Sequence, residues 1–275
     1  MSAFQHVLVG LDLNEVYATA LLERACQVAD QDRIEAIHAC DNTHQTHHEY
    51  PIGYFSSSEQ LDEAVRRNAD SFMERVCRPV GVSRHVVLDG PPAPTLHGYA
   101  RNRADLIVVG SHGRTGLIGM LGSTSNDMLH GTECNVLAVH LDDDAACGTR
   151  RYGTVMACID LSNSSFQVLD TADAVAQRSG ADLVICHVSN ADQAKIEREY
   201  DRLLHFADAY GVEPFAVHSP RGATAREIHA LASQLGVDLV VIGNHGKRGL
   251  ALLTGSKANA VLHGATCDEL SVRIN

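Results

Sequence analysis

The residues whose types and spacing best suit chemistry form a glycine-rich segment that occurs twice. After a short apolar run the first copy reads GSHGRTG from Gly110 and the second reads GNHGKRG from Gly243. Each copy then reaches a Gly-Ser pair, at Ser123 and Ser256, before a stretch of helical character. Glycines let backbone amides approach a ligand closely, and a helix start offers unpaired N–H groups at the positive end of its dipole. The pattern favours an anion-binding loop over a purely structural turn, with each serine acting as an N-cap, as a ligand through its hydroxyl group, or as both.

The spacing of these glycines matches neither of two familiar phosphate loops. It lacks the Gly-Lys-Ser/Thr of Walker A and the G-x-G-x-x-G of dinucleotide-binding folds. His112 and His245 recur inside the segments and suit either contact with a phosphate or a hydrogen bond to local backbone. Asp12 and Asp160 have the chemistry of general bases, but no nucleophile, second carboxylate or metal-ligand set lies near them in sequence. No catalytic centre is therefore predicted.

Two other groups of residues have the chemistry of metal ligands. His44, His47, His48 and Glu49 lie close together but lack helical i, i+4 spacing and a second ligand cluster. A solvated polar loop is the favoured interpretation, so no metal site is predicted. The eight cysteines are scattered without a C-x-x-C motif, which favours free thiols over disulfides, zinc ligands or redox centres.

The repeated glycine segments belong to a duplication that spans the chain. The stretch from Asp105 to His140 aligns without a gap with the stretch from Asp238 to Arg273, and VLVGLD near the start aligns with VMACID. A chain of 275 residues is long enough for two cores of ordinary size. We therefore expect two domains, residues 1–141 and 151–275, joined by an acidic segment of small residues.

Each half carries short apolar runs separated by amphipathic stretches of helical length. Because the runs are rich in Val, Ile and Leu without inside–outside alternation, both faces of the sheet must be covered, which indicates parallel strands with crossover helices. The expected strands are Val7–Leu11, Ile34–Ala39, His85–Leu88, Leu106–Val109, Val136–Val139, Val155–Ile159, Leu183–Val188, Phe215–His218, Leu239–Ile242 and Leu270–Ile274. The expected helices are Tyr17–Gln31, Ser58–Cys77, Thr95–Arg103, Ser123–His130, Ser165–Ser179, Asp192–Tyr210, Thr224–Leu235 and Ser256–His263.

The composition narrows the classes of partner. The net charge is −12, which disfavours a nucleic-acid backbone or an anionic membrane surface because either would be repelled. No apolar run is long enough for a membrane helix, so no membrane insertion is expected. The N-terminus enters a strand without a basic region or a small-residue cleavage site, which predicts a cytoplasmic protein.

Five landmarks occur in the same order in both halves. They are a strand followed by aspartate, a strand carrying His38 or His187, the G-x-H-G segment, the Gly-Ser pair and a Leu-His-Gly ending. In this the chain resembles the universal stress protein family in its tandem two-domain form. The resemblance implies two Rossmann-like domains of the adenine nucleotide alpha hydrolase-like type. Each would be an α/β unit with a five-stranded parallel sheet of order 3-2-1-4-5 and helices on both faces.

The resemblance also implies a ligand and a site. The ligand is ATP or AMP, with Mg²⁺ accompanying ATP, in a crevice between strands one and four. In ATP-binding members the aspartate after strand one lies by the adenosine, the backbone after the strand-two histidine touches adenine, and the glycine loop holds ribose and phosphates. Carried over residue by residue, this gives Asp12, Ala39, Gly110, Gly113, Gly122, Ser123 and Thr124 in the first half, and Asp160, Val188, Gly243, Gly246, Gly255, Ser256 and Lys257 in the second.

Both glycine loops depart from the ATP-binding members in length. Those members place nine residues between G-x-x-G and Gly-Ser/Thr, whereas RTGLIGML and KRGLALLT have eight, and one missing residue rotates or retracts a loop amide. The expected function is a stress-response regulator that binds a nucleotide in at least one half. The alternatives are an interaction module of the same fold without nucleotide, and a weak ATPase. If one half alone binds, we expect the second, because its loop has Lys247, Arg248 and Lys257 nearby, against Arg114 in the first.

The expected partners are an adenine nucleotide and a protein client that the sequence does not identify. The fifth strands, Val136–Val139 and Leu270–Ile274, are expected to pair across a pseudo-twofold axis, which would hide their exposed edges in an intramolecular pseudo-dimer. The sequence leaves open whether whole chains form a homodimer.

Overall fold

The computed structural model describes residues 3–40, 58–112, 128, 132–141, 151–245, 260–261 and 266–274. The predicted helices Ser123–His130 and Ser256–His263 lie outside these residues except at 128 and 260–261. The described strands of the first half are β1 (Val7–Gly10), β2 (Ile34–Cys40), β3 (Arg84–Asp89), β4 (Leu106–His112) and β5 (Asn135–Leu141). Its described helices are α1 (Glu15–Val28), α2 (Ser58–Cys77) and α3 (Pro92–Ala100), with short 3-10 turns η1 (Gln31–Arg33) and η2 (Arg78–Val80).

The second half repeats this alternation of strands and helices. Its described strands are β6 (Thr154–Cys158), β7 (Asp182–Cys186), β8 (Ala216–His218), β9 (Leu239–His245) and β10 (Asp268–Ile274). Its described helices are α5 (Ser165–Ser179), α6 (Gln193–Ala209) and α7 (Thr224–Leu235). None of the described helices is both long and apolar enough to cross a bilayer.

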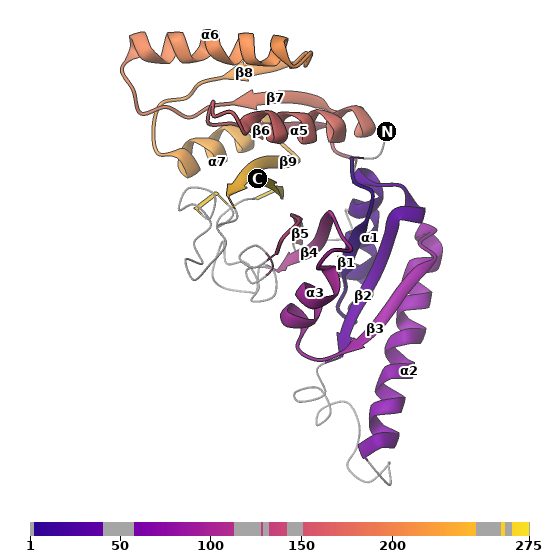
Figure 1. Cartoon of the computed structure of the whole chain (residues 1–275). Coiled ribbons are helices and arrows are strands. Elements are labelled where there is room, and N and C mark those ends of the chain that lie inside the picture. The colour runs from indigo at the N-terminus through magenta and orange to yellow at the C-terminus, as the bar shows by residue number, and fades with distance from the viewer. Residues whose placement is uncertain are drawn as a thin grey trace.

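All ten strands form one sheet of order β3-β2-β1-β4-β5-β10-β9-β6-β7-β8 (Figure 1). Strands within each half are parallel, and β5 and β10 pair antiparallel with Leu137 opposite Leu270. The predicted α/β class, with a mostly parallel sheet in two repeated halves, is confirmed. The fifth strands pair as expected, so the two halves share a continuous sheet.

Helices cover both faces of this sheet. One apolar core lies under α1, α2, α5 and α6, and a second lies under α3 and α7. Side chains alternate between the two cores along a strand: Val7 and Val9 of β1 face the first core, and Leu8 faces the second. This two-sided burial explains why the strands read as continuous apolar runs.

The seam between the halves contains a buried ion pair. Asp268 of β10 lies 2.9 Å from the Arg24 Nε of α1 and accepts hydrogen bonds from the Tyr152 hydroxyl (2.8 Å) and the His140 N–H (2.9 Å). The Arg24 guanidinium also lies 4.9 Å from the centre of the Tyr152 ring. Burial raises the pKa of Asp268, and the Arg24 charge opposes that rise. A single carboxylate thus joins elements of both halves.

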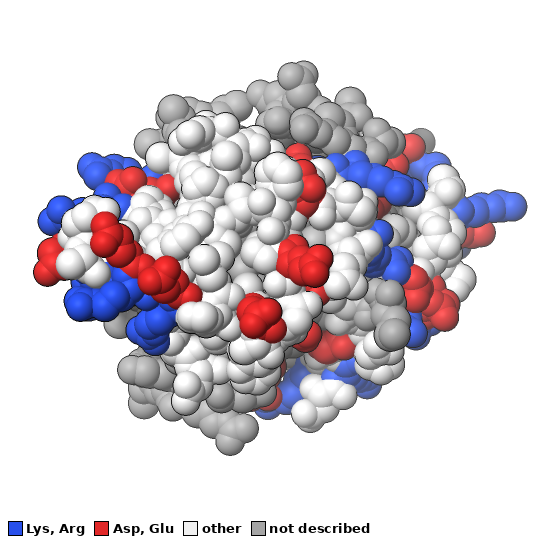
Figure 2. Space-filling view, turned by 90° about the horizontal axis from the view of Figure 1, so that it is seen from above, with Lys and Arg blue, Asp and Glu red and all other residues white. Residues whose placement is uncertain are grey.

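Charged residues elsewhere lie mostly on the surface. Figure 2 shows the face nearest α6, where Asp and Glu side chains interrupt a broad uncharged area and Lys and Arg side chains lie toward the margins. The basic residues in view do not merge into one patch, which agrees with the net charge of −12. The seven cysteines among the described residues are free thiols, as expected.

Candidate functional site

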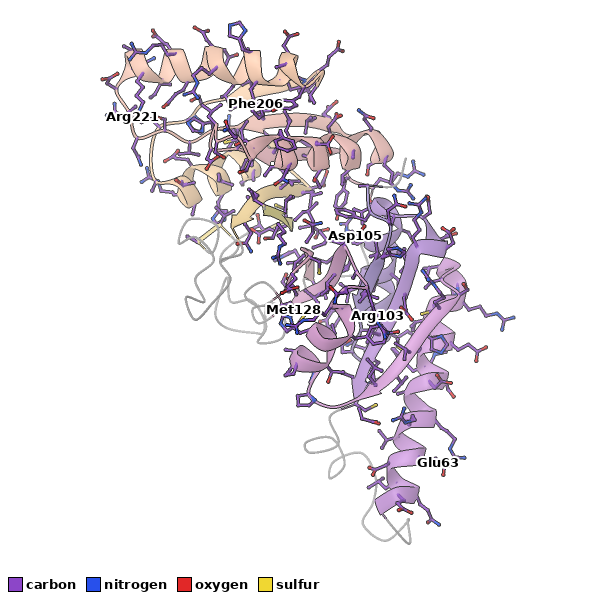
Figure 3. All side chains as sticks on the ribbon, in the orientation of Figure 1. Glu63, Arg103, Asp105, Met128, Phe206 and Arg221 are labelled. Carbon is purple, nitrogen blue, oxygen red and sulfur yellow. The ribbon has the colours of Figure 1, made fainter. Side chains whose placement is uncertain are left out.

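The candidate site lies at the carboxyl ends of the central strands in each half. Strand one pairs with strand two on one side and strand four on the other, and in folds of this kind the ligand crevice lies at such a reversal. Asp12 and Asp160 lie two residues beyond the ends of β1 and β6 and therefore border the two crevices. Asp105, labelled in Figure 3, marks the opposite edge, where its carboxylate accepts the Gln5 N–H (2.8 Å) and the His6 N–H (3.0 Å).

The strand-two histidines hold the carbonyl group that ends strand one. His38 is buried in β2, and its Nδ1 lies 2.8 Å from the carbonyl oxygen of Leu11. His187 follows β7, and its Nδ1 lies 2.9 Å from the carbonyl oxygen of Ile159. Because a carbonyl oxygen only accepts, Nδ1 carries the proton and donates in both halves. The same side chain therefore makes the same bond at both crevices.

In the first half this imidazole bond takes the place of the next backbone hydrogen bond between β1 and β2. The ladder between β1 and β2 ends where the Leu11 N–H donates to the carbonyl of Ile37 (2.8 Å). The backbone of Cys40 points to the β3 side of β2, since its carbonyl accepts the Gly90 N–H (2.9 Å). Alternate residues of a strand bond to opposite neighbours, so the Ala39 N–H and carbonyl face beyond β1. Within the described residues neither group has a ladder partner there, and both point toward the crevice.

The second half has the same arrangement at Val188. The ladder between β6 and β7 ends where the Ile159 N–H donates to the carbonyl of Cys186 (2.9 Å), and the His187 N–H turns the other way to the carbonyl of His218 (3.0 Å). By the same alternation, the Val188 N–H and carbonyl face the crevice beyond β6. A donor and an acceptor from a single residue are thus presented at each crevice.

The two crevice aspartates shape the turn that leads into the following helix. Asp12 accepts the Asn14 N–H (3.2 Å). Asp160 accepts the Ser162 N–H (3.0 Å) and the Ser165 hydroxyl (2.9 Å). Both aspartates are exposed, and each carboxylate holds the local turn.

The glycines that end strand four have a packing role. A Cβ on Gly110 would meet the side chain of Leu141, and a Cβ on Gly243 would meet those of Ile274 and Val168. Neither glycine has a positive φ. The sequence pattern favours an anion-binding loop over a purely structural turn at these glycines, and the structure shows that packing of the fifth strand against each of them leaves no room for a Cβ.

A charged cluster adjoins the second crevice. Glu199 of α6 is buried, with Oε2 3.7 Å from the His187 Nε2 and Oε1 3.7 Å from the Lys195 Nζ. A hydrogen bond from the Ser189 hydroxyl, followed by the nearby positive charges, lowers the pKa of Glu199. By contrast, the His38 Nε2 in the first half is buried with no hydrogen-bond partner among the described residues. The sequence analysis missed this cluster, because a glutamate inside a polar helix carries no pattern that marks it as buried.

Several predicted site residues lie outside the part of the chain that the structure describes. His112 and His245 end β4 and β9, but their side chains also lie outside it. Among the described residues, no group of three or more His, Cys, Asp or Glu side chains is arranged to hold a metal ion. The predicted residues outside the description are Gly113, Gly122, Ser123, Thr124, Gly246, Gly255, Ser256 and Lys257, together with the loop residues His44, His47, His48 and Glu49.

Two α/β halves, each with a parallel sheet whose strand order reverses between strands one and four, define the Rossmann-like class of folds. The Universal stress protein family matches residues 3–140 and 151–273, so the chain belongs to that family and contains two tandem domains of it. Universal stress protein A homolog 1 of Coxiella burnetii is 34% identical over 138 residues, covering 44% of this chain and 96% of that protein. A universal stress protein of Mycobacterium tuberculosis strain H37Rv is 30% identical over 190 residues, covering 63% of each chain.

A solved structure that aligns over almost the whole chain shows the same fold. A universal stress protein from Archaeoglobus fulgidus aligns over 98% of both chains with a TM-score of 0.75 at 18% identity. A universal stress protein in complex with cAMP is 30% identical and covers 45% of this chain and 98% of its own, with a TM-score of 0.39.

Proposed function

We propose that this tandem universal stress protein binds an adenine nucleotide in the crevice of at least one half and acts as a nucleotide-responsive regulator. The observation that carries the proposal is the backbone N–H and carbonyl of Ala39 and of Val188, which have no ladder partner on the crevice side among the described residues. One N–H donor and one carbonyl acceptor complement the adenine edge, which presents N1 as acceptor and the N6 amino group as donor. Guanine presents the reverse pattern at these positions, so the crevice should select adenine.

The rest of the nucleotide would extend across the sheet edge toward strand four. Asp12 or Asp160 would accept a ribose hydroxyl, because each carboxylate is exposed beside the end of strand one. The glycine segments that follow β4 and β9 would hold the phosphates through backbone amides and a helix start. ATP and AMP both suit this layout, and Mg²⁺ would accompany ATP through its phosphates. The residues assigned to the phosphates are Gly110, Gly113, Gly122, Ser123, Thr124, Gly243, Gly246, Gly255, Ser256 and Lys257.

Calorimetric titration of the full chain with ATP, AMP and GTP tests this proposal. Binding of ATP or AMP at least about tenfold tighter than GTP is expected, because a mismatched buried donor or acceptor costs about 1–3 kcal/mol. Failure of the chain to bind either adenine nucleotide, or equal affinity for GTP, would overturn the assignment.

We call the hydrogen bonds from His38 to Leu11 and from His187 to Ile159 the histidine clamps. Variants of a clamp test the role of the backbone pair beside it. His187→Ala leaves the Ile159 carbonyl without its imidazole donor, so the Val188 N–H can form the missing rung and adenine affinity in the second half should fall. His85→Ala is a matched control, because His85 lies on β3 and contacts Asp70 of α2 (3.1 Å), away from either crevice. This substitution should leave the affinity unchanged. Equal effects of the two substitutions would argue against the clamp.

A second candidate, an interaction module of the same fold that binds no nucleotide, has one observation in its favour. The packing of Gly110 against Leu141, and of Gly243 against Ile274, would preserve these glycines without any ligand. Under this alternative, purified chain would contain no nucleotide and ATP would not raise its melting temperature. A client protein and a cytoplasmic location remain predictions under either function.

A further inference from the structure

Two cysteines face each other directly beneath the second crevice. Cys158 ends β6 and Cys186 ends β7, and the two residues are register partners in this parallel pair. Both belong to the same face of the sheet, because both contact the core under α7. The residues that follow them, Ile159 and His187, form the imidazole clamp of the second crevice.

The geometry of the pair suits a disulfide. Neighbouring strands lie about 4.8 Å apart, and disulfides span Cα separations of about 4.4–6.8 Å. The Cys186 thiol is the largest cause of the raised pKa of Cys158, which agrees with two neighbouring side chains on one face of the sheet. Cys158 is the less buried residue of the two, so we assign the first attack to Cys158.

The first half has no such pair. By the repeat, Gly10 and Ile37 occupy the positions of Cys158 and Cys186, and they are register partners in β1 and β2. The Gly10 position is filled by the side chain of Leu96, which a Cβ there would meet. Any thiol chemistry at this level of the sheet is therefore confined to the second half.

We propose that Cys158 and Cys186 form a reversible disulfide with a low-molecular-weight disulfide as oxidant, and that this bond changes nucleotide binding in the second half. The effect on binding rests on the proposed function, whereas formation of the bond does not. Closure would draw the sulfur atoms to about 2.05 Å and shift the ends of β6 and β7. Ile159 and His187 would move with them, and the Val188 backbone pair would lose its alignment to adenine.

The reaction balances as two exchange steps. The Cys158 thiolate attacks the small disulfide, forms a mixed disulfide and expels one small thiolate. The Cys186 thiolate then attacks the Cys158 sulfur, forms the Cys158–Cys186 bond and expels the second small thiolate. Two protein thiols are oxidised, one small disulfide is reduced to two thiols, and the two protons pass to those thiols. The neighbouring Cys186 thiol, followed by burial, raises the pKa of Cys158, so the exchange should be slow at neutral pH and faster in alkaline buffer.

The covalent step is tested by peptide mapping. Reduced full-length protein is incubated with oxidised glutathione in alkaline buffer, the remaining thiols are alkylated, and the digest is analysed by mass spectrometry without reduction. A peptide linked through Cys158 and Cys186 is expected in the wild type and in the control variant Cys40→Ser, and it should return to free thiols with dithiothreitol. No linked peptide in native protein, or stable glutathione on Cys158 alone, would overturn the proposal.

The effect on binding is tested by titrating reduced and oxidised protein with ATP or AMP. Oxidation should weaken the second-half site about tenfold or more, and Cys158→Ser should abolish this dependence. Unchanged affinity in protein that carries the linked peptide would refute the regulatory part. If no adenine nucleotide binds the reduced protein, the proposed function fails and with it the regulatory part, while the mapping result still decides whether the disulfide forms.

Discussion

Glu269 should make the stability of the protein depend on pH in a way that one substitution removes. Glu269 lies on β10 at the seam, is 2% exposed, and its Oε1 has no hydrogen-bond partner among the described residues. Burial, with a smaller contribution from Asp268, raises its pKa from 4.5 to about 9. Glu269 is therefore neutral in the folded protein at neutral pH and ionised in the unfolded chain.

The sign of the effect follows from this shift. A carboxyl group whose pKa is raised by folding gives its full stability below the unfolded pKa of 4.5, and that stability is lost as the pH rises toward about 9. The loss is about 1.4 kcal/mol per pH unit within this window. Between about pH 5 and about pH 8 the wild type should therefore lose about 4 kcal/mol relative to a variant that cannot ionise.

Urea unfolding followed by circular dichroism measures this difference. Glu269→Gln removes the titrating group, and Glu269→Val installs the residue that the repeat places at the equivalent position, Val136. Both variants should gain stability relative to the wild type as the pH rises. Glu63→Gln is the control, since the Glu63 side chain is 69% exposed (Figure 3) and its effect should stay within a few tenths of a kcal/mol. A difference between Glu269→Val and the wild type that stays constant from about pH 5 to about pH 8 would refute the reasoning.

Four further substitutions, two at the seam, one before α7 and one in α3, are tested by the same unfolding assay. Tyr152→Phe removes the hydroxyl that donates to Asp268 and should cost about 1.5–3 kcal/mol. Arg24→Met leaves the Asp268 carboxylate buried without its cation and should cost about 3–5 kcal/mol near neutral pH, with a smaller loss in acid where Asp268 is protonated. Gly222→Ala should cost about 1–3 kcal/mol, because Gly222 has φ +155° and a Cβ there would meet the Glu227 side chain. Gly98→Ala in α3 meets no atom within 4 Å and should be neutral or stabilising by up to about 1 kcal/mol.

The described helices could be predicted from the sequence, but the ends of α1, α3 and α6 differ from the predicted ones. The predicted bounds of α2, α5 and α7 match the structure. Helix α1 begins at Glu15 instead of Tyr17, because the Asn14 side chain accepts the N–H groups of Val16 (3.1 Å) and Tyr17 (3.2 Å). Helix α3 begins at Pro92 instead of Thr95, since proline is tolerated in the first turn, where its missing N–H has no intrahelical partner.

The crevices could be located from the sequence, but their detailed contacts could not. The repeat places Asp12 and Asp160 at strand ends, and the fold brings both to the sheet edge. The role of His38 and His187 depends on where a ladder stops, which no sequence pattern encodes. The burial of Glu199 depends on how α6 packs over the end of β7, and the facing of Cys158 and Cys186 depends on strand register.

The duplication has preserved backbone geometry and changed the side chains around it. Both halves keep the imidazole bond that ends strand one, because that bond directs the Ala39 or Val188 backbone at the crevice. Side chains that titrate or oxidise beside the clamp occur in the second half: Glu199 lies 3.7 Å from the His187 Nε2, and Cys158 lies one residue before Ile159. Since the clamp is shared and its surroundings are not, a change in solution conditions should alter the second crevice while the first keeps its affinity. Nucleotide stoichiometry measured under reducing and oxidising conditions would then differ by the contribution of one half.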